Sequence, residues 1–225
     1  MPGAHSELLR LYSQITGCES SSERCPGVVR DLLRGIPPRG FFTEAEPGEV
    51  QLLLVAKNPG HVIEGETALY AGHGAEEVAR AHLTWARRCF FDPGSFSRES
   101  RRSLVFHKNI LRYVSVFLDV PEREVFRHCA YTNIVKCQTI GEQDSLQRRT
   151  IEECFSRHFA EETRVLRPKV ILGLGREAFD FLLAHSHQHG RPVLYLKHPS
   201  YYYRKDLEPK VLGELRAKIR AVLGN

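Results

Sequence analysis

Two short uninterrupted apolar runs constrain the fold of this 225-residue chain more than any other feature. Residues 52–55 read Leu-Leu-Leu-Val and residues 170–174 read Val-Ile-Leu-Gly-Leu, each bounded by polar or turn-forming residues. A strand with successive apolar residues buries both of its faces, which is typical of a parallel sheet covered by helices on both sides. Gly173-Leu174-Gly175 lacks the third glycine of a dinucleotide-binding fingerprint, so we expect these glycines to serve close helix–strand packing instead.

Two more segments, 129–137 and 193–197, have the composition of strands, so four strands are expected. Strands that alternate with helices predict a three-layer α/β/α fold around a central, mostly parallel four-stranded sheet. No change in composition marks a linker, so we expect one domain over residues 1–225, with a helix and a cysteine loop in residues 1–40 packed on it. Helices are predicted at residues 4–17, 28–33, 76–90, 104–118, 147–166, 176–184 and 207–223.

The composition is that of a globular protein with a moderate basic excess. A hydrophobic content of 42% supports a core, and the net charge of +5 fits either a nucleic-acid partner or an ordinary basic surface. The sequence has no signal-peptide pattern and no apolar run of the ~20 residues that span a bilayer. We therefore expect a cytoplasmic, prokaryote-like monomer without membrane association.

Polar side chains follow three of the four predicted strands. Asn58, Asn133 and His198 each stand at or just beyond the carboxyl end of a strand. Ligands of open parallel sheets bind beyond the carboxyl ends of the strands, so we expect these three side chains to share one site.

Two of these strand ends lie in motifs with alternative interpretations. In Asn58-Pro59-Gly60-His61 the asparagine could orient a water molecule and the glycine could let a ligand approach the backbone, or the motif could be a simple turn. His198 could donate to a developing oxyanion. The tyrosines and cations that follow it, through Lys205, could stack on bases and hold phosphates, or the segment could be a core histidine with an aromatic packing patch.

Six cysteines form two groups. Cys18 and Cys25 are seven positions apart, Cys137 and Cys154 are seventeen apart, and four such thiolates suit either zinc or an iron–sulfur cluster, with plain burial as the alternative. A disulfide framework is not expected in an intracellular chain of this size. The remaining two, at 89 and 129, lie in apolar patterns that predict buried thiols.

Taken together, these motifs resemble the uracil-DNA glycosylase superfamily, and most closely its iron–sulfur branch, called family four. Asn133-Ile134-Val135-Lys136-Cys137 is similar, residue for residue, to the Asn-x-Val-Lys-Cys strand of that branch. Pro59-Gly60 resembles its first turn, and Tyr70, ten residues after Gly60, stands where that branch has the aromatic residue that stacks on the extruded base. The segment from His198 to Arg204 resembles its last motif. Two departures stand out: Lys57 replaces an acidic residue, and six residues separate Cys18 from Cys25. Asn58 instead resembles the mismatch-specific and single-strand-selective branches.

The resemblance implies a DNA glycosylase that hydrolyses the N-glycosidic bond of a flipped uracil and so initiates base excision repair. It implies a structural 4Fe-4S cluster, with zinc as the less favoured occupant. The alternatives are a glycosylase for hypoxanthine or xanthine, and a non-catalytic iron–sulfur nucleic-acid-binding protein. The implied roles are catalysis by Asn58, His198 and His61; base binding by Tyr70, Asn133, Pro59 and Gly60; DNA binding by Ser200, Tyr202, Tyr203, Arg204 and Lys205; and cluster ligation by Cys18, Cys25, Cys137 and Cys154.

Overall fold

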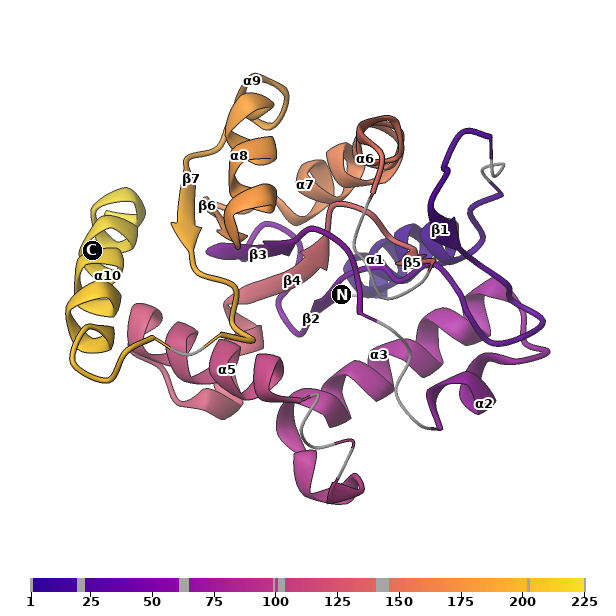
Figure 1. Ribbon diagram of the computed structural model, residues 1–225, viewed down its shortest axis with the longest axis horizontal. Helices are drawn as coiled ribbons and strands as arrows, with labels where there is room; N and C mark the ends of the chain where they lie inside the picture. The colour runs from indigo at the N-terminus through magenta and orange to yellow at the C-terminus, as the bar shows by residue number, and fades with distance from the viewer. Residues whose placement is uncertain are drawn as a thin grey trace.

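A five-stranded sheet forms the centre of the computed structural model, which describes residues 2–19, 23–60, 65–98, 100, 104–140, 146–201 and 203–224 (Figure 1). The strand order is β2-β4-β3-β6-β7. The last four of these are mutually parallel, which confirms the four predicted strands, and β2 pairs antiparallel with β4 at the edge. The sequence did not reveal β2, because its two residues are too few to show a pattern. The strands are β2 (Phe42–Thr43), β3 (Leu52–Ala56), β4 (Cys129–Asn133), β6 (Val170–Leu174) and β7 (Val193–Leu196).

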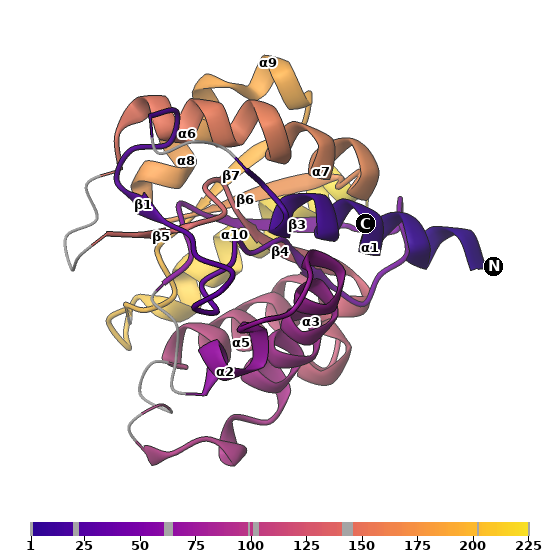
Figure 2. The same ribbon diagram turned by 90° about the vertical axis from the view of Figure 1, so that its right-hand side faces the viewer.

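Helices cover both faces of the sheet, as the continuous apolar strands require. Alternate residues of β3 enter two different cores: Leu52 and Leu54 face one group of helices, and Leu53 and Val55 face the other. In Figure 2, helices α6 to α9 lie above the strands and α3 and α5 lie below them. The first face packs against α3 (Ala75–Phe91), α5 (Val105–Leu118) and α10 (Glu208–Leu223), and the second against α1 (Pro2–Thr16), α7 (Ala160–Leu166) and α8 (Arg176–Ala184).

Two local predictions differ from the structure, and four short elements were not predicted. The predicted helix at 28–33 is wrong: β1 (Val28–Val29) instead pairs antiparallel with β5 (Gln138–Thr139) in a separate two-stranded sheet. The pairing partner is more than a hundred residues away, so local periodicity could not reveal it. The predicted helix at 147–166 is α6 (Arg148–Cys154) and α7 joined by a π-helical turn, η3 (Phe155–Phe159). The helices α2 (Glu66–Tyr70) and α9 (Ser186–His189) and the 3₁₀ turns η1 (Pro93–Ser95) and η2 (Glu122–Arg127) were not predicted.

Two glycines bring a helix and a loop close to the end of β6. A Cβ atom on Gly173 would come within 2.7 Å of the Phe179 backbone, so only glycine lets α8 pack this closely, which confirms the packing role expected from the sequence. Gly175 has a φ of +90°, and a Cβ there would lie 3.4 Å from the Cβ of His198. The end of β6 therefore supports the segment that carries His198. None of the described helices is long and apolar enough to cross a membrane.

Candidate active site

A cavity of about 410 Å³ lies where the carboxyl ends of β3, β4 and β7 converge. We call it the strand-end cavity. Ala56 pairs with Asn133 in the sheet register, so Asn58, two residues further, lies beside the end of β4. The structure therefore brings together side chains from three distant segments, as the strand-end argument predicted. The predicted site residues that line the strand-end cavity are Asn58, Pro59, Gly60, Asn133, His198 and Ser200.

Backbone hydrogen bonds continue between these segments beyond the ends of the strands. The Ile134 N–H donates to Ala56 O and the Val135 N–H donates to Lys57 O, both at 2.9 Å. The ammonium group of Lys57 lies 2.5 Å from a carboxylate oxygen of Glu177 on α8. The side chain of Lys57 is thus directed towards α8.

Asn133 is only 3% exposed, and a neighbouring hydroxyl orients its side chain. Tyr131 O–H donates to Asn133 Oδ1 at 3.2 Å. Burial raises the pKa of Tyr131 to about 12, although the bond to Asn133 and the charge of Arg39 oppose this rise, so the phenol remains a donor at neutral pH. The carboxamide therefore presents Nδ2 as a donor and the second lone pair of Oδ1 as an acceptor.

The imidazole of His198 is held by its backbone neighbourhood and by an aromatic ring. The Ser200 N–H donates to Nδ1 at 3.3 Å, so in the neutral tautomer the ring proton is on Nε2. The ring of Phe106 lies 5.2 Å from the imidazole and 5.4 Å from the ring of Tyr131, measured between centroids. His198 is thus arranged as a hydrogen-bond donor through Nε2.

Asn58 is half-buried at the start of the Pro59-Gly60 turn. Its Nδ2 donates to Pro59 O at 3.2 Å. This bond engages the nitrogen of the amide, which leaves the side-chain oxygen as the atom suited to accept a hydrogen bond from a water molecule. The position agrees with a water-orienting group.

A polar wall that the sequence did not predict completes the cavity. Arg39 donates through Nη1 to Gly60 O at 3.0 Å and forms an ion pair, at 3.1 Å, with Glu66, a carboxylate that is only 2% exposed. His82 and His107 also line the cavity. Burial, with a smaller contribution from Arg39, lowers the pKa of His82 to about 3 and that of His107 to about 4, so both rings are neutral at pH 7.

No strand-end pattern could have identified this wall. His82 and His107 belong to α3 and α5, and Arg39 precedes the two-residue strand β2. The only available signal was the presence of histidines in otherwise amphipathic helices, which is common in helices of any kind.

The structure does not bring Tyr70 to the cavity. Its side chain is fully buried at the end of α2, its hydroxyl donates to Glu66 Oε1 at 3.3 Å, and its ring lies 6.0 Å from that of His82. Tyr70 therefore lies behind the polar wall, and a counted spacing from Gly60 did not predict its depth. The aromatic residues that line the cavity are Phe42, Trp85, Phe90, Phe106 and Tyr131.

The segment after His198 divides into buried and exposed tyrosines. The hydroxyl oxygen of Tyr203 accepts from the Lys197 N–H at 3.1 Å, and the Tyr203 ring lies 6.1 Å from that of Tyr113, so this side chain packs inward. Tyr201 is 65% exposed and its ring lies 6.1 Å from His198, a position the sequence did not single out. Arg204 pairs with Asp206 at 2.9 Å on the surface, where Lys205 is also exposed. His61 and Tyr202 lie outside the described residues.

Cys18, Cys25, Cys137 and Cys154 line a second cavity, of about 230 Å³, which we call the cysteine cavity. Burial, followed by the neighbouring Cys154 and Cys18 thiols, raises the pKa of Cys137. Burial also raises the pKa of Cys154 to about 12, although nearby Lys136 opposes this. Thiols this buried remain protonated unless a metal replaces the proton. The other two cysteines, at 89 and 129, are buried as predicted, and Cys89 also lines the strand-end cavity.

The cysteine cavity lies between segments that are far apart in the sequence. Cys18 and Cys25 flank the N-terminal loop, where Arg30 Nη1 donates to Cys18 O at 2.7 Å. The Lys136 N–H donates to Cys154 Sγ at 3.3 Å. In the described part of the chain, no group of three or more His, Cys, Asp or Glu side chains is close enough to hold a single metal ion. The four thiols thus surround a space without closing on one point.

A known protein family matches most of the chain. The family model described as the Uracil DNA glycosylase superfamily matches residues 42–220, which include all three segments of the strand-end cavity. None of the curated proteins compared with the chain matches it.

Proposed function

Because this chain belongs to the uracil-DNA glycosylase superfamily, a family of DNA glycosylases, we propose that it flips uracil out of DNA and hydrolyses the N-glycosidic bond. Enzymes that act on a base must first remove it from the stack. The strand-end cavity is the place we assign to the extruded base. The observation that carries the proposal is that Asn133 and His198 line this one cavity.

Asn133 would select uracil by its hydrogen-bonding edge. Uracil offers an N3–H donor and an O4 acceptor, which match the remaining acceptor site on Oδ1 and the Nδ2 donor. Cytosine presents the reverse pattern at these two atoms and would leave both groups unpaired, at a cost of about 1–3 kcal/mol for each buried group. Tyr131 supports this selection, because it determines which end of the carboxamide accepts.

His198 would stabilise the leaving base as the glycosidic bond breaks. The bond cleaves to a sugar cation and a uracil anion, and the Nε2–H of His198 would donate to the anion's O2. Asn58 would orient the water molecule that captures the cation. We propose Phe106 for the ring that contacts the base, because it lies beside both Tyr131 and His198. The helper role predicted for His61 stays a prediction.

The surface beside His198 would hold the DNA. Ser200, Tyr201, Arg204 and Lys205 are all exposed there. Cations in this segment would bind phosphates, so affinity should fall as salt concentration rises. Tyr201 is the exposed aromatic that we propose for filling the gap left by the extruded base, because Tyr203 packs inward.

We also propose that the cysteine cavity holds a 4Fe-4S cluster through Cys18, Cys25, Cys137 and Cys154, with zinc as the less favoured occupant. Four thiols that surround a space of about 230 Å³ without converging on one point suit a cluster better than a single ion. When bound, the group would be structural and tie the N-terminal loop to β4 and α6. Lys136, Arg30 and Arg157 also line the cavity and would offset the charge of the thiolates.

A second candidate function is supported by the size and polarity of the strand-end cavity. The volume of about 410 Å³ is not restricted to a single pyrimidine ring. The wall of Arg39, His82 and His107 also offers polar groups in addition to those that would bind one edge of a pyrimidine. A deaminated purine, hypoxanthine or xanthine, is therefore the alternative substrate.

A base-release assay separates these functions. Oligonucleotides that carry one uracil, hypoxanthine or xanthine are incubated with excess protein, and the free base is measured over time. We expect uracil release by the natural protein and a loss of roughly 100- to 1000-fold in His198→Ala, with DNA binding retained. Asn133→Asp should weaken discrimination against cytosine. His187→Ala, on exposed α9, is the matched control and should leave the rate unchanged.

Each other outcome identifies a different function. Release of purines alone would select the second candidate, and DNA binding without release of any base would indicate a non-catalytic protein. An unchanged rate in His198→Ala would remove this residue from the site.

A further inference from the structure

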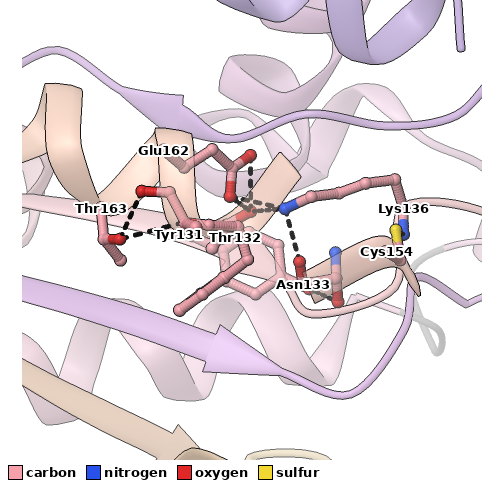
Figure 3. A network of polar contacts seen from close by, with 9 residues as sticks. Tyr131, Thr132, Asn133, Lys136, Cys154, Glu162 and Thr163 are labelled. Carbon is pink, nitrogen blue, oxygen red and sulfur yellow. Dashed lines mark hydrogen bonds and ion pairs between the residues drawn. The ribbon is translucent and has the colours of Figure 1, made fainter. Parts of the chain in front are cut away.

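A buried ion pair lies next to the backbone of Asn133. Lys136 Nζ is 2.5 Å from Glu162 Oε2, and the two side chains are 1% and 0% exposed. Lys136 follows the end of β4 by three residues, and Glu162 belongs to α7; Figure 3 shows the two side chains pointing toward each other. Charged pairs this deeply buried contribute little net stability, so their presence calls for another explanation.

All three protons of the Lys136 ammonium group have acceptors. Besides Glu162, Nζ donates to Thr132 Oγ1 at 2.8 Å and to the main-chain oxygen of Asn133 at 2.6 Å. Thr132 Oγ1 in turn lies 3.0 Å from Glu162 Oε2. A fully satisfied buried network of this kind allows one arrangement of its members.

The hydrogen bond from Lys136 Nζ to Asn133 O connects the ion pair to a residue that lines the strand-end cavity. Asn133 is the last residue of β4, and its main-chain oxygen accepts from Lys136 Nζ, so the ion pair is bonded to the backbone at the end of the strand. A peptide plane that is fixed by Lys136 also fixes the direction in which the Asn133 carboxamide leaves the backbone. Tyr131 then orients the amide group at its far end.

We propose that Lys136, held by Glu162 and Thr132, is the positioning residue that aims Asn133 at the base and thereby determines base selectivity. This inference rests on the proposed function of the strand-end cavity. Lys136 lines the cysteine cavity and is not among the residues that line the strand-end cavity, so we expect it to act through Asn133.

Two variants separate positioning from stability. In the double variant Lys136→Met/Glu162→Leu both charges are removed together, so the fold should retain its stability while the bond to Asn133 O is lost. In Glu162→Gln the ammonium group loses its counter-charge but keeps its acceptors, so stability should fall while the bond to Asn133 O persists. If the ion pair only stabilised the fold, base selectivity would fall in the variant that loses stability and would be retained in the variant that keeps it.

The control is an exposed ion pair on the same helix. Glu161 and Arg164 pair at 2.6 Å on α7 with exposures of 38% and 59%, so Glu161→Ala/Arg164→Ala should change neither property. Thr132→Val removes one acceptor of Nζ without removing a charge and provides a milder test if the double variant does not fold.

The measurements are the thermal midpoint and the uracil and cytosine release rates under single-turnover conditions. For the double variant we expect a midpoint close to that of the natural protein, a loss of about 100-fold in the ratio of uracil to cytosine release, as a misplacement of about 1 Å can cause, and unchanged DNA affinity. Thr132→Val should lose a smaller part of the ratio. Natural selectivity in both Lys136→Met/Glu162→Leu and Thr132→Val would overturn the inference.

Crystal structures of the natural protein and the folded variants distinguish this inference from the proposed function. If the natural protein releases no uracil, the proposed function fails, but displacement of the Asn133 carboxamide in the variants would still support its positioning by Lys136. An Asn133 side chain in the same place with and without Lys136 would refute the positioning, whatever the activity.

Discussion

The hydroxyl of Tyr131 and the carboxamide of Asn133 form a hydrogen bond of 3.2 Å between two residues of the same strand. Residues two apart in a strand point to the same face, so the strand itself brings donor and acceptor together. This bond selects one of the two orientations of the amide. It leaves Nδ2 directed at whatever acceptor enters the strand-end cavity.

Replacing Tyr131 with phenylalanine should relax base selectivity. The bond contributes about 0.5–1.5 kcal/mol, so its loss should lower the ratio of uracil to cytosine release by roughly 2- to 12-fold. Tyr113→Phe is the matched control, because its hydroxyl bonds to Glu208 rather than to a predicted site residue. Single-turnover rates on the two substrates provide the measurement, and an unchanged ratio in Tyr131→Phe would mean that Asn133 needs no such support.

The parts of the site that sequence could predict are those fixed by the sheet. Asn58, Asn133 and His198 follow parallel strands, and parallel strands must place their carboxyl ends at one edge. Their presence in one cavity could therefore be predicted from that geometry. The polar wall could not be predicted, because the positions of His82 and Arg39 depend on how α3 and the segment before β2 pack against the sheet.

Tyr70 illustrates the limit of counting residues along a chain. Its distance from Gly60 in the sequence says nothing about α2, which turns the side chain into the protein and places its hydroxyl on Glu66. The two-stranded sheet of β1 and β5 is a similar case, because its partners become neighbours only in the tertiary structure.

Arg39 should maintain the turn that carries Asn58. Its guanidinium group contacts both Gly60 O and Glu66, and its main-chain N–H donates to Lys136 O at 2.7 Å. Lysine at this position keeps the charge but cannot make both side-chain contacts in the same geometry. We expect Arg39→Lys to lower kcat by roughly 2- to 12-fold, as the loss of one hydrogen bond would, with little change in KM.

The control for Arg39→Lys is Arg87→Lys, which alters a surface pair with Glu44. Steady-state kinetics on a uracil-containing duplex should show no effect of Arg87→Lys. A change in KM alone for Arg39→Lys would indicate DNA binding rather than support of the turn.

The protein should lose stability as the pH falls below about 6.5, because His82 and His107 are buried in neutral form. Their pKa values are lowered to about 3 and about 4 in the folded state, from 6.5 in the unfolded state. Between about pH 6.5 and pH 4 the unfolded chain therefore binds protons that the folded protein does not. Each histidine should reduce the free energy of unfolding by up to about 1.4 kcal/mol per pH unit in this range.

Urea unfolding at several pH values measures this dependence. Removal of one titrating group in His107→Gln should make the fall in stability less steep, whereas Gln188→Ala, which changes an exposed residue of α9 that carries no proton, should leave the slope as it is. A His107→Gln variant with the natural slope would show that this ring is already protonated in the folded protein.

The four thiols of the cysteine cavity should determine iron content together. Single changes of Cys137 or Cys154 to alanine should remove the visible absorbance and most of the iron, since a cluster needs its full set of ligands. Cys129→Ala is the control, because this thiol is fully buried in the first core, away from the cavity, and iron content should be unaffected. If the purified protein is colourless and contains zinc, the cysteine cavity holds a single zinc ion and not a cluster.

Loss of the proposed cluster should also affect the strand-end cavity. Cys154 Sγ accepts from the main-chain N–H of Lys136, whose side chain holds Asn133, so a change at the cysteine cavity has a direct route to the base-reading amide. Iron removal by a chelator should therefore weaken uracil selectivity as well as lower the thermal midpoint. If selectivity in the folded fraction stays at the natural value after complete iron removal, the two cavities are independent, and the cluster, where present, stabilises the fold alone.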